Sequence, residues 1–390
     1  MNLFQRAISS IFPIKESEQR SVSFKNFGTT NITVDDKTAL TFTAVWSAVR
    51  LLSESVSTMP IEVYKREKNG DKFQATESPI YNLLKYGVNE NVSSVTFIEK
   101  TMKDLCLDGN SYAKIIRNGG ARPESIELWN YDDVDILTKD GKLFYSNIQK
   151  GDTVDSADIL HFKILTQDGI KGISPITQCK QAIEWGMSVE KFGNTFFQNG
   201  AKLSGVLQTD RQLSEQAVDR LRNSFNSVYS KLNNANSTAI LEEGLTFKPV
   251  SISAEQAQFL SSRYFSIAEV ARIFGIAPHL LKDLSKSSFN NIEMQSQEFV
   301  TYTLMPYLTR IESELNRKLF RKNEIGSMFV EFNANSLLRG NIKDRSEFYR
   351  TMLNIGAMTI NEIRRKENMN SIEDGNKHFI QLNMTTIENI

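Results

Sequence analysis

Residues 239–320 read AILEEGLTFKPVSISAEQAQFLSSRYFSIAEVARIFGIAPHLLKDLSKSSFNNIEMQSQEFVTYTLMPYLTRIESELNRKLF. This stretch decides the fold because it holds, in order, a β-like segment, helices with clear start signals, a polar loop and a very long helix. The runs 239–241 and 245–247 are short and β-like, and the letters EEG at 242–244 separate them. That spacing predicts a small hairpin.

Two capped helices are expected after the hairpin. Ser253 and Ser266 are each followed three residues later by Gln or Glu, which is the spacing of a capping box. Gly275 and Pro278 should close the second helix, since both residue types are common just beyond helix ends. The sequence therefore predicts one helix that begins at Ser253 and a second that begins at Ser266.

A polar loop at 284–290 leads into a helix of about thirty residues, which would be ~45 Å long at 1.5 Å per residue. Pro306 lies inside this helix. Because proline has no N–H and its ring clashes with the preceding turn, we expect a kink just before Leu308.

The letters IAEVARIFGIAPHLL, within residues 266–281, resemble the first helix and turn of a helix-turn-helix. A DNA-binding regulator built on them would need a second helix whose N-terminal side chains reach bases in the major groove. Here the turn runs instead into Pro278 and the apolar pair Leu280 and Leu281. The sequence favours a buried joint, and the regulator stands as the alternative function.

The polar loop carries two lysines, Lys282 and Lys286, with the small polar residues Ser287, Ser288 and Asn290. One interpretation is an ordinary connection between helices. The other is a mobile loop that faces a ligand or a pore, with one or two lysines on phosphates. Such contacts are weak and salt-sensitive, so they suit sliding rather than holding. The residues alone leave both interpretations open.

The N-terminal half mixes helices and strands. Apolar residues recur at helical spacing over 40–59, where a proline ends the pattern, and a second helical region covers 94–108 and stops at a glycine. Residues 61–64 alternate like a strand. Short β-rich runs over 112–164, broken by glycine-containing turns, predict an antiparallel meander. This half is therefore expected to be α+β, preceded by a polar, irregular segment at 13–38.

Two more helices are predicted in the middle of the chain. Ser174 is a good N-cap, Pro175 suits the first helical position and Gly200 follows the last periodic residue, so one helix of ~37 Å is expected. The next helix begins at the Ser214 cap. It carries an apolar stripe at alternating spacings of three and four, typical of a helix packed on another helix. The stripe consists of Val218, Leu221, Phe225, Val228 and Leu232.

The C-terminal region is predicted to contain one strand and two helices. Residues 328–332 alternate as a strand, and helical patterns cover 341–355 and 360–368. Thr359 and Glu362 have the spacing of a capping box at the start of the last helix.

The whole-chain composition excludes several function classes. A chain of 390 residues is long enough for two or three domains. Lys plus Arg and Asp plus Glu both total 46, so the net charge is zero. A dedicated nucleic-acid binder usually has a basic excess, so any DNA contact must be local or weak. Neither GxxxxGK[ST] nor GxGxxG occurs, which argues against an NTP-driven motor.

The chain has no sequence signal for a membrane span or for export. No apolar run approaches the ~20 residues needed to cross a bilayer. The first twelve residues, MNLFQRAISSIF, are apolar on one helical face but lack a small-residue cleavage site, so a signal peptide is not expected. An arm that docks on a neighbouring subunit is favoured over a membrane-surface helix.

Metal and catalytic sites have little support in the sequence. Two cysteines without CxxC spacing and three histidines argue for a reducing compartment and against structural zinc. The aspartates at 132–135 could suggest a carboxylate–metal enzyme, but solvated turn acids are favoured. His161 is predicted to be a satisfied strand histidine, His279 a packing or capping residue and His378 part of the tail. No enzyme activity and no cofactor are therefore expected.

Taken in order, a set of segments resembles the portal proteins of tailed bacteriophages, in the shorter branch associated with long non-contractile tails. The resemblance covers roughly residues 38–365. It includes TALTFTAVWSAVRLLSESVSTMPIEVYKR, DGNSYAKIIRNGGARPESIELW, DILHFKI, GISPI, FFQNGA, AILEEGLTFKPVSIS and IAEVARIFGIAPHLL. No single segment is decisive, but their order is specific to the family.

The resemblance implies an α+β portal fold with a wing, a helical stem, a small clip, a long kinked spine helix and a short helical crown. The boundaries it implies are a flexible N-terminal arm at 1–38, the wing at 39–204, a stem helix at 205–235, the clip at 236–253, a second stem-helix region at 254–280, a tunnel loop at 281–291, the spine helix and a returning wing strand at 292–334, and the crown with the C-terminal tail at 335–390.

The resemblance also implies a non-enzymatic homo-oligomeric ring at one vertex of the virion capsid, usually of twelve subunits, assembled in the cytoplasm of the bacterial host. Double-stranded DNA would pass through the ring without being read, and the tunnel loop with Lys282 and Lys286 would face it. The implied protein partners are the terminase large subunit, the major capsid and scaffold proteins, and the head–tail adaptor. The stripe that begins at Val218 would then pack either between subunits or within one.

Overall fold

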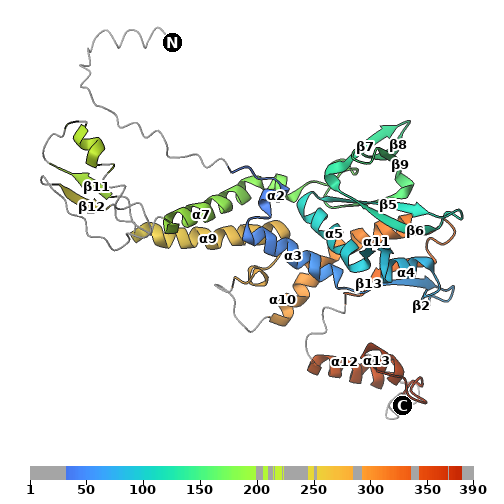
Figure 1. The fold of residues 1–390 in the computed structure, drawn as a ribbon. Coiled ribbons are helices and arrows are strands. Elements are labelled where there is room, and N and C mark those ends of the chain that lie inside the picture. Colours follow the sequence, from blue (N-terminus) through green and yellow to red (C-terminus); the bar gives the residue numbers. More distant parts are fainter. Residues whose placement is uncertain are drawn as a thin grey trace, which may run out of the picture. The chain divides into compact units, whose positions relative to one another are not determined.

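The computed structural model describes residues 32–198, 205–209, 214, 216–221, 223, 245–249, 253–283, 292–334, 342–367 and 369–379 (Figure 1). The chain divides into two units, Met1–Thr33 and Val34–Ile390. The second unit mixes helices and strands, as the sequence predicts. Among the helices of the described residues, none has the length and apolarity needed to cross a membrane.

The first element of the second unit is the short helix α2 (Asp36–Ala39). The carboxylate of Asp35 accepts the N–H of Thr38 at 2.7 Å, and the Thr38 hydroxyl accepts the N–H of Asp35 at 2.8 Å. This reciprocal pair is a capping box. The predicted irregular arm at 1–38 is therefore wrong over its last residues, while residues 1–31 lie outside the described part of the chain.

Helices α3 (Thr43–Ser57) and α5 (Ser94–Leu107) pack on each other, close to their predicted positions. Both bury one apolar face, as their periodicity requires. The sequence did not indicate α4 (Pro79–Lys85), whose seven residues are too few to establish a helical period. The small pair β3 (Gly87–Asn89) and β4 (Val92–Ser93) lies between α4 and α5 in the chain.

The predicted meander divides into two antiparallel sheets. One has the order β10-β5-β6, the other β7-β8-β9. The last strand, β10, does not pair with its predecessor β9 but returns to β5, with His161 opposite Tyr112. The meander is thus right for β5–β6 and for β7–β8–β9, and wrong between β6 and β7, which belong to different sheets, and at its end. The strands are β5 (Asn110–Arg117), β6 (Pro123–Trp129), β7 (Val134–Lys139), β8 (Lys142–Asn147), β9 (Asp152–Asp155) and β10 (Ile159–Lys163).

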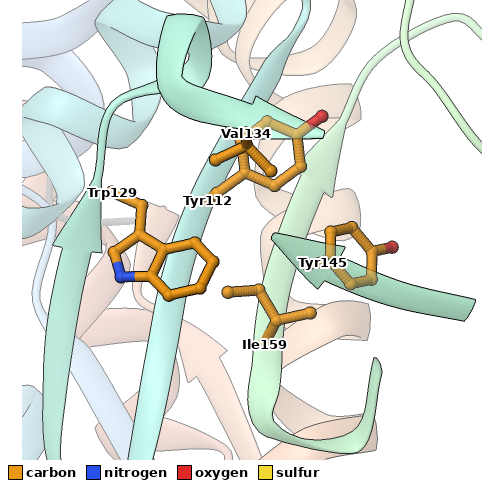
Figure 2. Packing of buried hydrophobic residues seen from close by; sticks show 5 residues of the cluster. All are labelled: Tyr112, Trp129, Val134, Tyr145 and Ile159. Carbon is orange, nitrogen blue, oxygen red and sulfur yellow. The ribbon is translucent and has the colours of Figure 1, made fainter. Parts of the chain in front are cut away.

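One apolar cluster joins these two sheets (Figure 2). Each of its five buried side chains comes from a different strand, so the cluster fixes the sheets to each other. Its two tyrosines pack with ring centroids 6.0 Å apart. Aromatic residues of this size make large contributions to core burial. The cluster consists of Tyr112, Trp129, Val134, Tyr145 and Ile159.

A third sheet brings the two ends of this region together. It has the order β13-β1-β2, with β1 (Ile61–Arg66) paired to β13 (Met328–Phe332) and to β2 (Lys72–Gln74). The pairing confirms that the predicted strand 328–332 exists. It also shows that this strand joins a sheet whose other members lie more than 250 residues earlier, Val63 standing opposite Val330.

The predicted helix from Ser174 to Gly200 is interrupted. It consists of α6 (Pro175–Gln178) and α7 (Lys180–Gln198), separated by Cys179 at φ −104° and ψ 19°. The Ser174 hydroxyl caps α6 by accepting the N–H of Thr177 at 3.1 Å, as predicted, and it donates to the Leu107 carbonyl at 2.8 Å. The first turn is therefore tied to the end of α5, whereas α7 packs against α9.

The predicted hairpin at 239–247 stays a prediction, and the pairing that the structure does show was not expected. Strand β12 (Thr246–Pro249) pairs with β11 (Gly205–Gln208), and residues 239–244 lie outside the described part of the chain. The range 205–235, expected to be a stem helix, therefore opens on a strand. Its helical residues include 216–221, where Ser214 caps the chain by accepting the N–H of Ala217 at 3.3 Å.

The two helices predicted from Ser253 and from Ser266 form a single helix, α9 (Ser253–Phe274). Ser266 is buried inside it, and its hydroxyl donates to the carbonyl of Arg263 at 2.7 Å instead of capping an N-terminus. In Figure 1, α9 runs beside α7.

The long helix after residue 291 has three parts: α10 (Ile292–Glu298), a π-helix (Phe299–Leu304) and α11 (Met305–Lys318). The chain ends with α12 (Ile342–Asn354) and α13 (Ile360–Lys366). The predicted capping box of α13 is confirmed, because Thr359 and Glu362 exchange hydrogen bonds of 2.7 and 3.2 Å.

Candidate functional site

The chain turns sharply after α9, where the sequence placed a joint. Gly275 adopts φ +64°, a left-handed conformation that glycine accepts without steric cost. The next N–H, that of Ile276, donates to the Ala271 carbonyl at 2.8 Å and closes the helix end. Phe274 and Ile276 are buried on either side of the glycine. The turn is therefore packed at Phe274 and Ile276, whereas Gly275 and Pro278 are exposed, so the buried joint that the sequence favoured is confirmed only in part.

Up to Asp283, where the described residues pause, one short turn of 3₁₀-helix, Pro278–Leu281, follows the joint. A helix-turn-helix reader requires a recognition helix of several turns at this place. Together with the continuity of α9 through Ser266, this makes the regulator alternative wrong: the described residues contain neither its first short helix nor its second.

Lys282 is the last but one described residue before the polar loop. It is exposed and adopts φ +66°, and its N–H donates to the His279 carbonyl at 3.0 Å. A left-handed conformation is unusual for lysine and costs about 1 kcal/mol. The other loop residues proposed to face DNA, Lys286, Ser287, Ser288 and Asn290, lie outside the described residues. Their role stays a prediction.

The segment that follows the loop is held to the joint by a hydrogen bond. The hydroxyl of Thr303, in the π-helix, donates to the main-chain carbonyl of Gly275. Thr303 is itself buried. This hydrogen bond therefore connects the end of α9, which precedes residues 284–291, to the π-helix, which follows them. The sequence gives no sign of this contact, because nothing in a local pattern links positions 28 residues apart.

The interruption of the long helix differs from the predicted kink. In a π-helix each N–H donates to the carbonyl five residues earlier instead of four. Here the N–H of Met305 donates to the Val300 carbonyl. Pro306 follows directly and has no N–H to donate to Tyr302. The π-helix therefore lies before Pro306, over 299–304, and the kink just before Leu308 stays a prediction. Pro306 correctly indicated that the long helix is irregular near this point. Single π-turns inside α-helices are frequent at functional sites.

Helix α7 supports α9 along a seam of aromatic rings and glycines. Trp185 contacts Phe265 with ring centroids 5.5 Å apart, and Phe192 contacts Phe259 at 5.9 Å. The earlier residue of α7, Trp185, contacts the later residue of α9, Phe265, so the two helices are antiparallel. Gly193, on the same helix, lies so close to Phe259 that a Cβ atom there would approach the ring to 2.6 Å. This pairing positions the joint at the end of α9.

The apolar stripe predicted for the helix after Ser214 is only partly described. Val218 is 38% exposed and Leu221 is half-buried. The remaining members, Phe225, Val228 and Leu232, lie outside the described residues. Their packing, within a subunit or between subunits, stays a prediction.

His161 is a satisfied buried histidine, as the sequence predicts. Its Nε2 lies 3.0 Å from the Asn110 side-chain oxygen, which also accepts the N–H of Gly172 at 2.6 Å. An oxygen can only accept, so Nε2 carries the proton and Nδ1 accepts the Tyr145 hydroxyl at 3.0 Å. Burial lowers the pKa of His161 to about 3, so the ring is neutral. It has no partner arrangement suited to catalysis.

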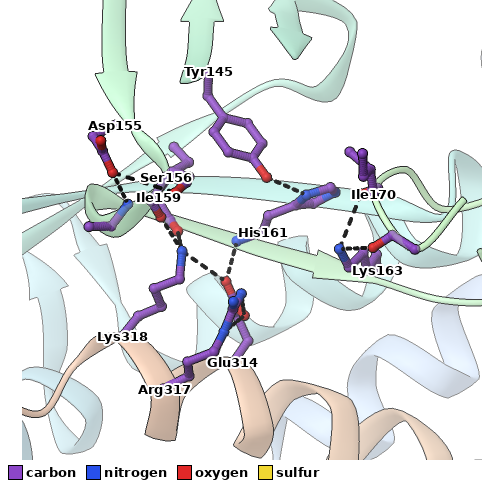
Figure 3. Close-up of polar contacts among 12 residues, drawn as sticks. Tyr145, Asp155, Ser156, Ile159, His161, Lys163, Ile170, Glu314, Arg317 and Lys318 are labelled. Carbon is purple, nitrogen blue, oxygen red and sulfur yellow. Dashed lines mark hydrogen bonds and ion pairs between the residues drawn. The ribbon is translucent and has the colours of Figure 1, made fainter. Parts of the chain in front are cut away.

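Helix α11 is bound to β10 through charged residues beside this histidine (Figure 3). The buried carboxylate of Glu314 accepts the main-chain N–H of His161 at 3.1 Å and is paired with Arg317. The ammonium of Lys318 donates to the Ile159 carbonyl at 3.1 Å. The sequence analysis missed Glu314. Its only signal was an acidic residue on the apolar face of a predicted helix.

The acidic residues at 132–135 do not gather into a metal site. Asp132 and Asp133 lie in a 3₁₀-turn, and Asp135 lies on β7. Within the residues that the structure describes, no group of three His, Cys, Asp or Glu could hold a metal ion. Burial does raise the pKa of nearby Asp108 to about 6, and its carboxylate accepts the side-chain N–H of Asn110 at 2.8 Å.

Comparisons with known proteins agree on one family. The sequence model described as phage portal protein matches residues 43–368. The portal protein of Enterobacteria phage HK97 is 30% identical over 348 residues, which cover 88% of this chain and 82% of that protein. The probable portal protein of Streptomyces phage phiC31 is 31% identical over 371 residues, 90% of this chain and 80% of the relative.

Solved structures share the fold. A crystal structure of an HK97-family phage portal protein from Corynebacterium diphtheriae matches with a TM-score of 0.58 at 19% identity, over 78% of this chain and 96% of that one. A chain in the neck of a native gene transfer agent particle, computed with C12 symmetry, matches with a TM-score of 0.57 over 86% of this chain and 94% of its own length. The chain belongs to the phage portal protein family of the HK97 type, and it is a structural, non-enzymatic component of the portal vertex of a virion, where it serves capsid assembly and DNA packaging.

Proposed function

We propose that copies of this chain form a ring of twelve in the virion, through which double-stranded DNA passes without being read. The observation that carries the proposal is the match, over 86% of the chain, to a chain in a particle neck with C12 symmetry. The zero net charge supports it, because a channel that lets DNA slide must avoid the strong grip of a basic groove.

Within the ring, helices α7 and α9 are the candidates for the stem. They pair antiparallel, and the seam through Phe192 and Phe259 holds them together. The strand pair β11–β12 and the residues that it encloses then form the clip. This proposal shifts the expected boundaries: the stem helix moves from 205–235 to α7, and the clip extends from 236–253 to the whole span 205–249. Residues 39–179 with α11 and β13 would form the wing, and α12 and α13 the crown.

The polar loop after Lys282 is proposed to face the channel. Two described features support this role. The loop follows the turn at Gly275, and the Thr303 hydrogen bond connects that turn to the helix by which the loop returns. A connection fixed at both ends can present its lysines at a constant place on each subunit. Weak phosphate contacts from the loop lysines of twelve subunits would let DNA slide through the ring rather than hold it in place.

The clip is the surface proposed to meet the terminase large subunit during packaging and the head–tail adaptor afterwards. The major capsid and scaffold proteins would contact the wing. The absence of any phosphate-binding loop motif from the sequence supports a separate packaging ATPase.

Native mass spectrometry and electron microscopy of the purified full-length chain test the proposal. We expect closed rings of twelve, or of a neighbouring number when the protein assembles without a capsid. A protein that stays monomeric or dimeric at every concentration and salt condition would count against the ring.

A further inference from the structure

A hollow of about 650 Å³ lies between strand β10, the loop that follows it and one face of helix α11. Figure 3 shows Glu314 and Lys318 of α11 reaching toward β10, whereas Lys163 of β10 donates to the loop carbonyl of Ile170. From the strand side, His161 and Lys163 line it, and from the helix side Arg310 and Arg317 do. The remaining lining residues are Ile164, Leu165, Thr166, Thr309, Ser313 and Glu314.

The lining carries more positive than negative charge. Lys163, Arg310 and Arg317 are cationic, and Glu314 is the one acidic residue among the lining residues. The carboxylate of Glu314 is already engaged, because it accepts the His161 main-chain N–H and pairs with both Arg317 and Lys318. It cannot neutralise the other cations as well. A hollow with two excess positive charges, in a chain whose net charge is zero, favours an anionic occupant.

The groups just outside the hollow do not remove this excess. Asp168 and Lys171 carry opposite charges, and the carboxylate of Asp168 accepts the main-chain N–H groups of Ile170 and Lys171 at 2.8 and 3.0 Å. His161 contributes no charge. Besides burial, the cations Lys163, Lys318, Arg317 and Lys171 all lower its pKa, which reports a positive field at the ring.

The other lining residues indicate which anion fits. Leu165 is 70% exposed and, with Ile164, gives the hollow an apolar wall. Ser313 and Thr166 supply hydroxyl groups. A carboxylate on an aliphatic stem matches this combination. Nε and Nη2 of Arg317 are bound to Glu314 and Nη1 of Arg310 donates to the Pro306 carbonyl at 2.8 Å, so the remaining N–H groups of Arg310 are the ones that bind a further carboxylate, with Arg317 adding charge. Duplex DNA fits less well, since its binders distribute many cations along the backbone, whereas here three are confined to one hollow.

We propose that this hollow binds an acidic segment of a protein partner, with a Glu or Asp side chain between Lys163, Arg310 and Arg317 and a neighbouring apolar side chain against Leu165. The site is formed by one chain, so it does not depend on ring formation. It lies outside the segments proposed for the channel and the clip.

Binding of a fluorescein-labelled peptide of alternating Glu and Leu, followed by fluorescence anisotropy, tests the site. We expect the full-length protein to bind this peptide, and R310Q with R317Q to weaken the affinity about tenfold or more, since each removes charge-assisted hydrogen bonds. R310Q alone should weaken it less, and it leaves the Arg317–Glu314 pair intact. L165S should weaken it through the lost apolar contact.

The matched control is the double variant K139Q with K142Q, which removes the same charge from the exposed turn between β7 and β8. It should bind the peptide like the wild type. The proposal is overturned if the R310Q and R317Q variant binds as tightly as the wild type, or if the control loses as much affinity. It is also overturned if a 20-bp DNA duplex binds at the hollow and the peptide does not. Ring formation is scored separately on the same samples by electron microscopy.

Discussion

The hydroxyl of Thr303 donates a hydrogen bond to the main-chain carbonyl of Gly275 and so connects the π-helix to the end of α9. Between these two residues lies the polar loop proposed to face DNA. The bond joins the helix that leads into the loop to the helix that leads out of it. Its loss should therefore affect both stability and the position of the loop.

Replacement of Thr303 by valine keeps the shape of the side chain and removes the donor. We expect T303V to lower the free energy of unfolding by about 1 kcal/mol, the usual contribution of one hydrogen bond, and T303S to retain most of it. Urea denaturation of both variants measures this. T301V is the matched control, because Thr301 is an exposed threonine of the same π-helix. Equal stability of T303V and the wild type would contradict the bridging role.

The packing of α3 beneath α7 and α9 is testable at Gly186. A Cβ atom there would lie 2.7 Å from the ring of Phe42, which is buried, and 3.3 Å from Cβ of Ser266. Alanine favours a helix over glycine by up to about 1 kcal/mol, but overpacking a core costs about 1–3 kcal/mol. We expect G186A to lower the thermal unfolding temperature. N194A, at an exposed position of the same helix, should not, and a gain in stability by G186A would refute the close approach.

Gly109 offers a test of a close backbone contact. It has φ +80°, and a Cβ atom would lie 2.3 Å from the carbonyl oxygen of Ile173. Gly70 has a similar φ of +94° but open space around it. Both alanine variants should carry the strain of a left-handed residue, about 1–2 kcal/mol. Only G109A should add the clash, so denaturant unfolding must show it to be clearly the less stable of the two. Similar losses in both would mean that the contact with Ile173 does not matter.

The buried histidine predicts a pH dependence. The pKa of His161 is about 3 in the folded chain and ~6.5 when unfolded, so the unfolded state binds the extra proton. Its neutral form stabilises the fold fully above pH ~6.5, and that stability is lost as the pH falls toward 3, by about 2 kcal/mol at pH 5. Asp108 acts in the opposite direction, because its raised pKa of about 6 favours folding at lower pH.

The contribution of His161 is isolated by comparing the wild type with H161Q at pH 7 and pH 5. The glutamine variant should be less stable at pH 7 but lose less stability on acidification. H378Q, at an exposed histidine, serves as the control and should lose as much stability between pH 7 and pH 5 as the wild type. Parallel pH profiles of H161Q and the wild type would exclude the assigned protonation state.

The loop lysines are tested by K282Q combined with K286Q. We expect rings to assemble normally and DNA packaging or retention to fall, because the proposed phosphate contacts are removed. Electron microscopy scores the rings, and nuclease-protected DNA in assembled heads scores packaging. K322Q, at an exposed lysine before β13, serves as a control for loss of charge. Normal packaging by the double variant would disprove the loop role.

Local signals in the sequence predicted elements better than they predicted pairings. The alternation over 61–64 and 328–332 correctly indicated strands, but nothing in either run tells that Ile61 lies opposite Phe332. The pairing of β10 with β5 was not predicted for the same reason, because register across a sheet depends on the packing of segments distant in the sequence. The family resemblance supplied the fold and the function that these local patterns could not.

The two capping signatures show why boundaries failed. Thr359 with Glu362 caps a helix, whereas Ser266 with Glu269 has the same spacing and lies inside one. A capping box requires the serine to be outside the helix, and no breaker precedes Ser266 to stop the helix there. Glu314, Asn110 and Thr303 were missed because their partners are distant in the sequence, and their contacts follow only from the folded chain.

The pairing of β11 with β12 has a consequence for how this chain can change over time. Gln208 lies opposite Thr246, so the segment between the two strands leaves and returns at neighbouring positions. Lengthening such a closed segment adds only about 0.6 kcal/mol of closure entropy for each doubling of its length. The segment between the strands, proposed above as part of the clip, can therefore change in length at little cost to the stability of the paired helices α7 and α9.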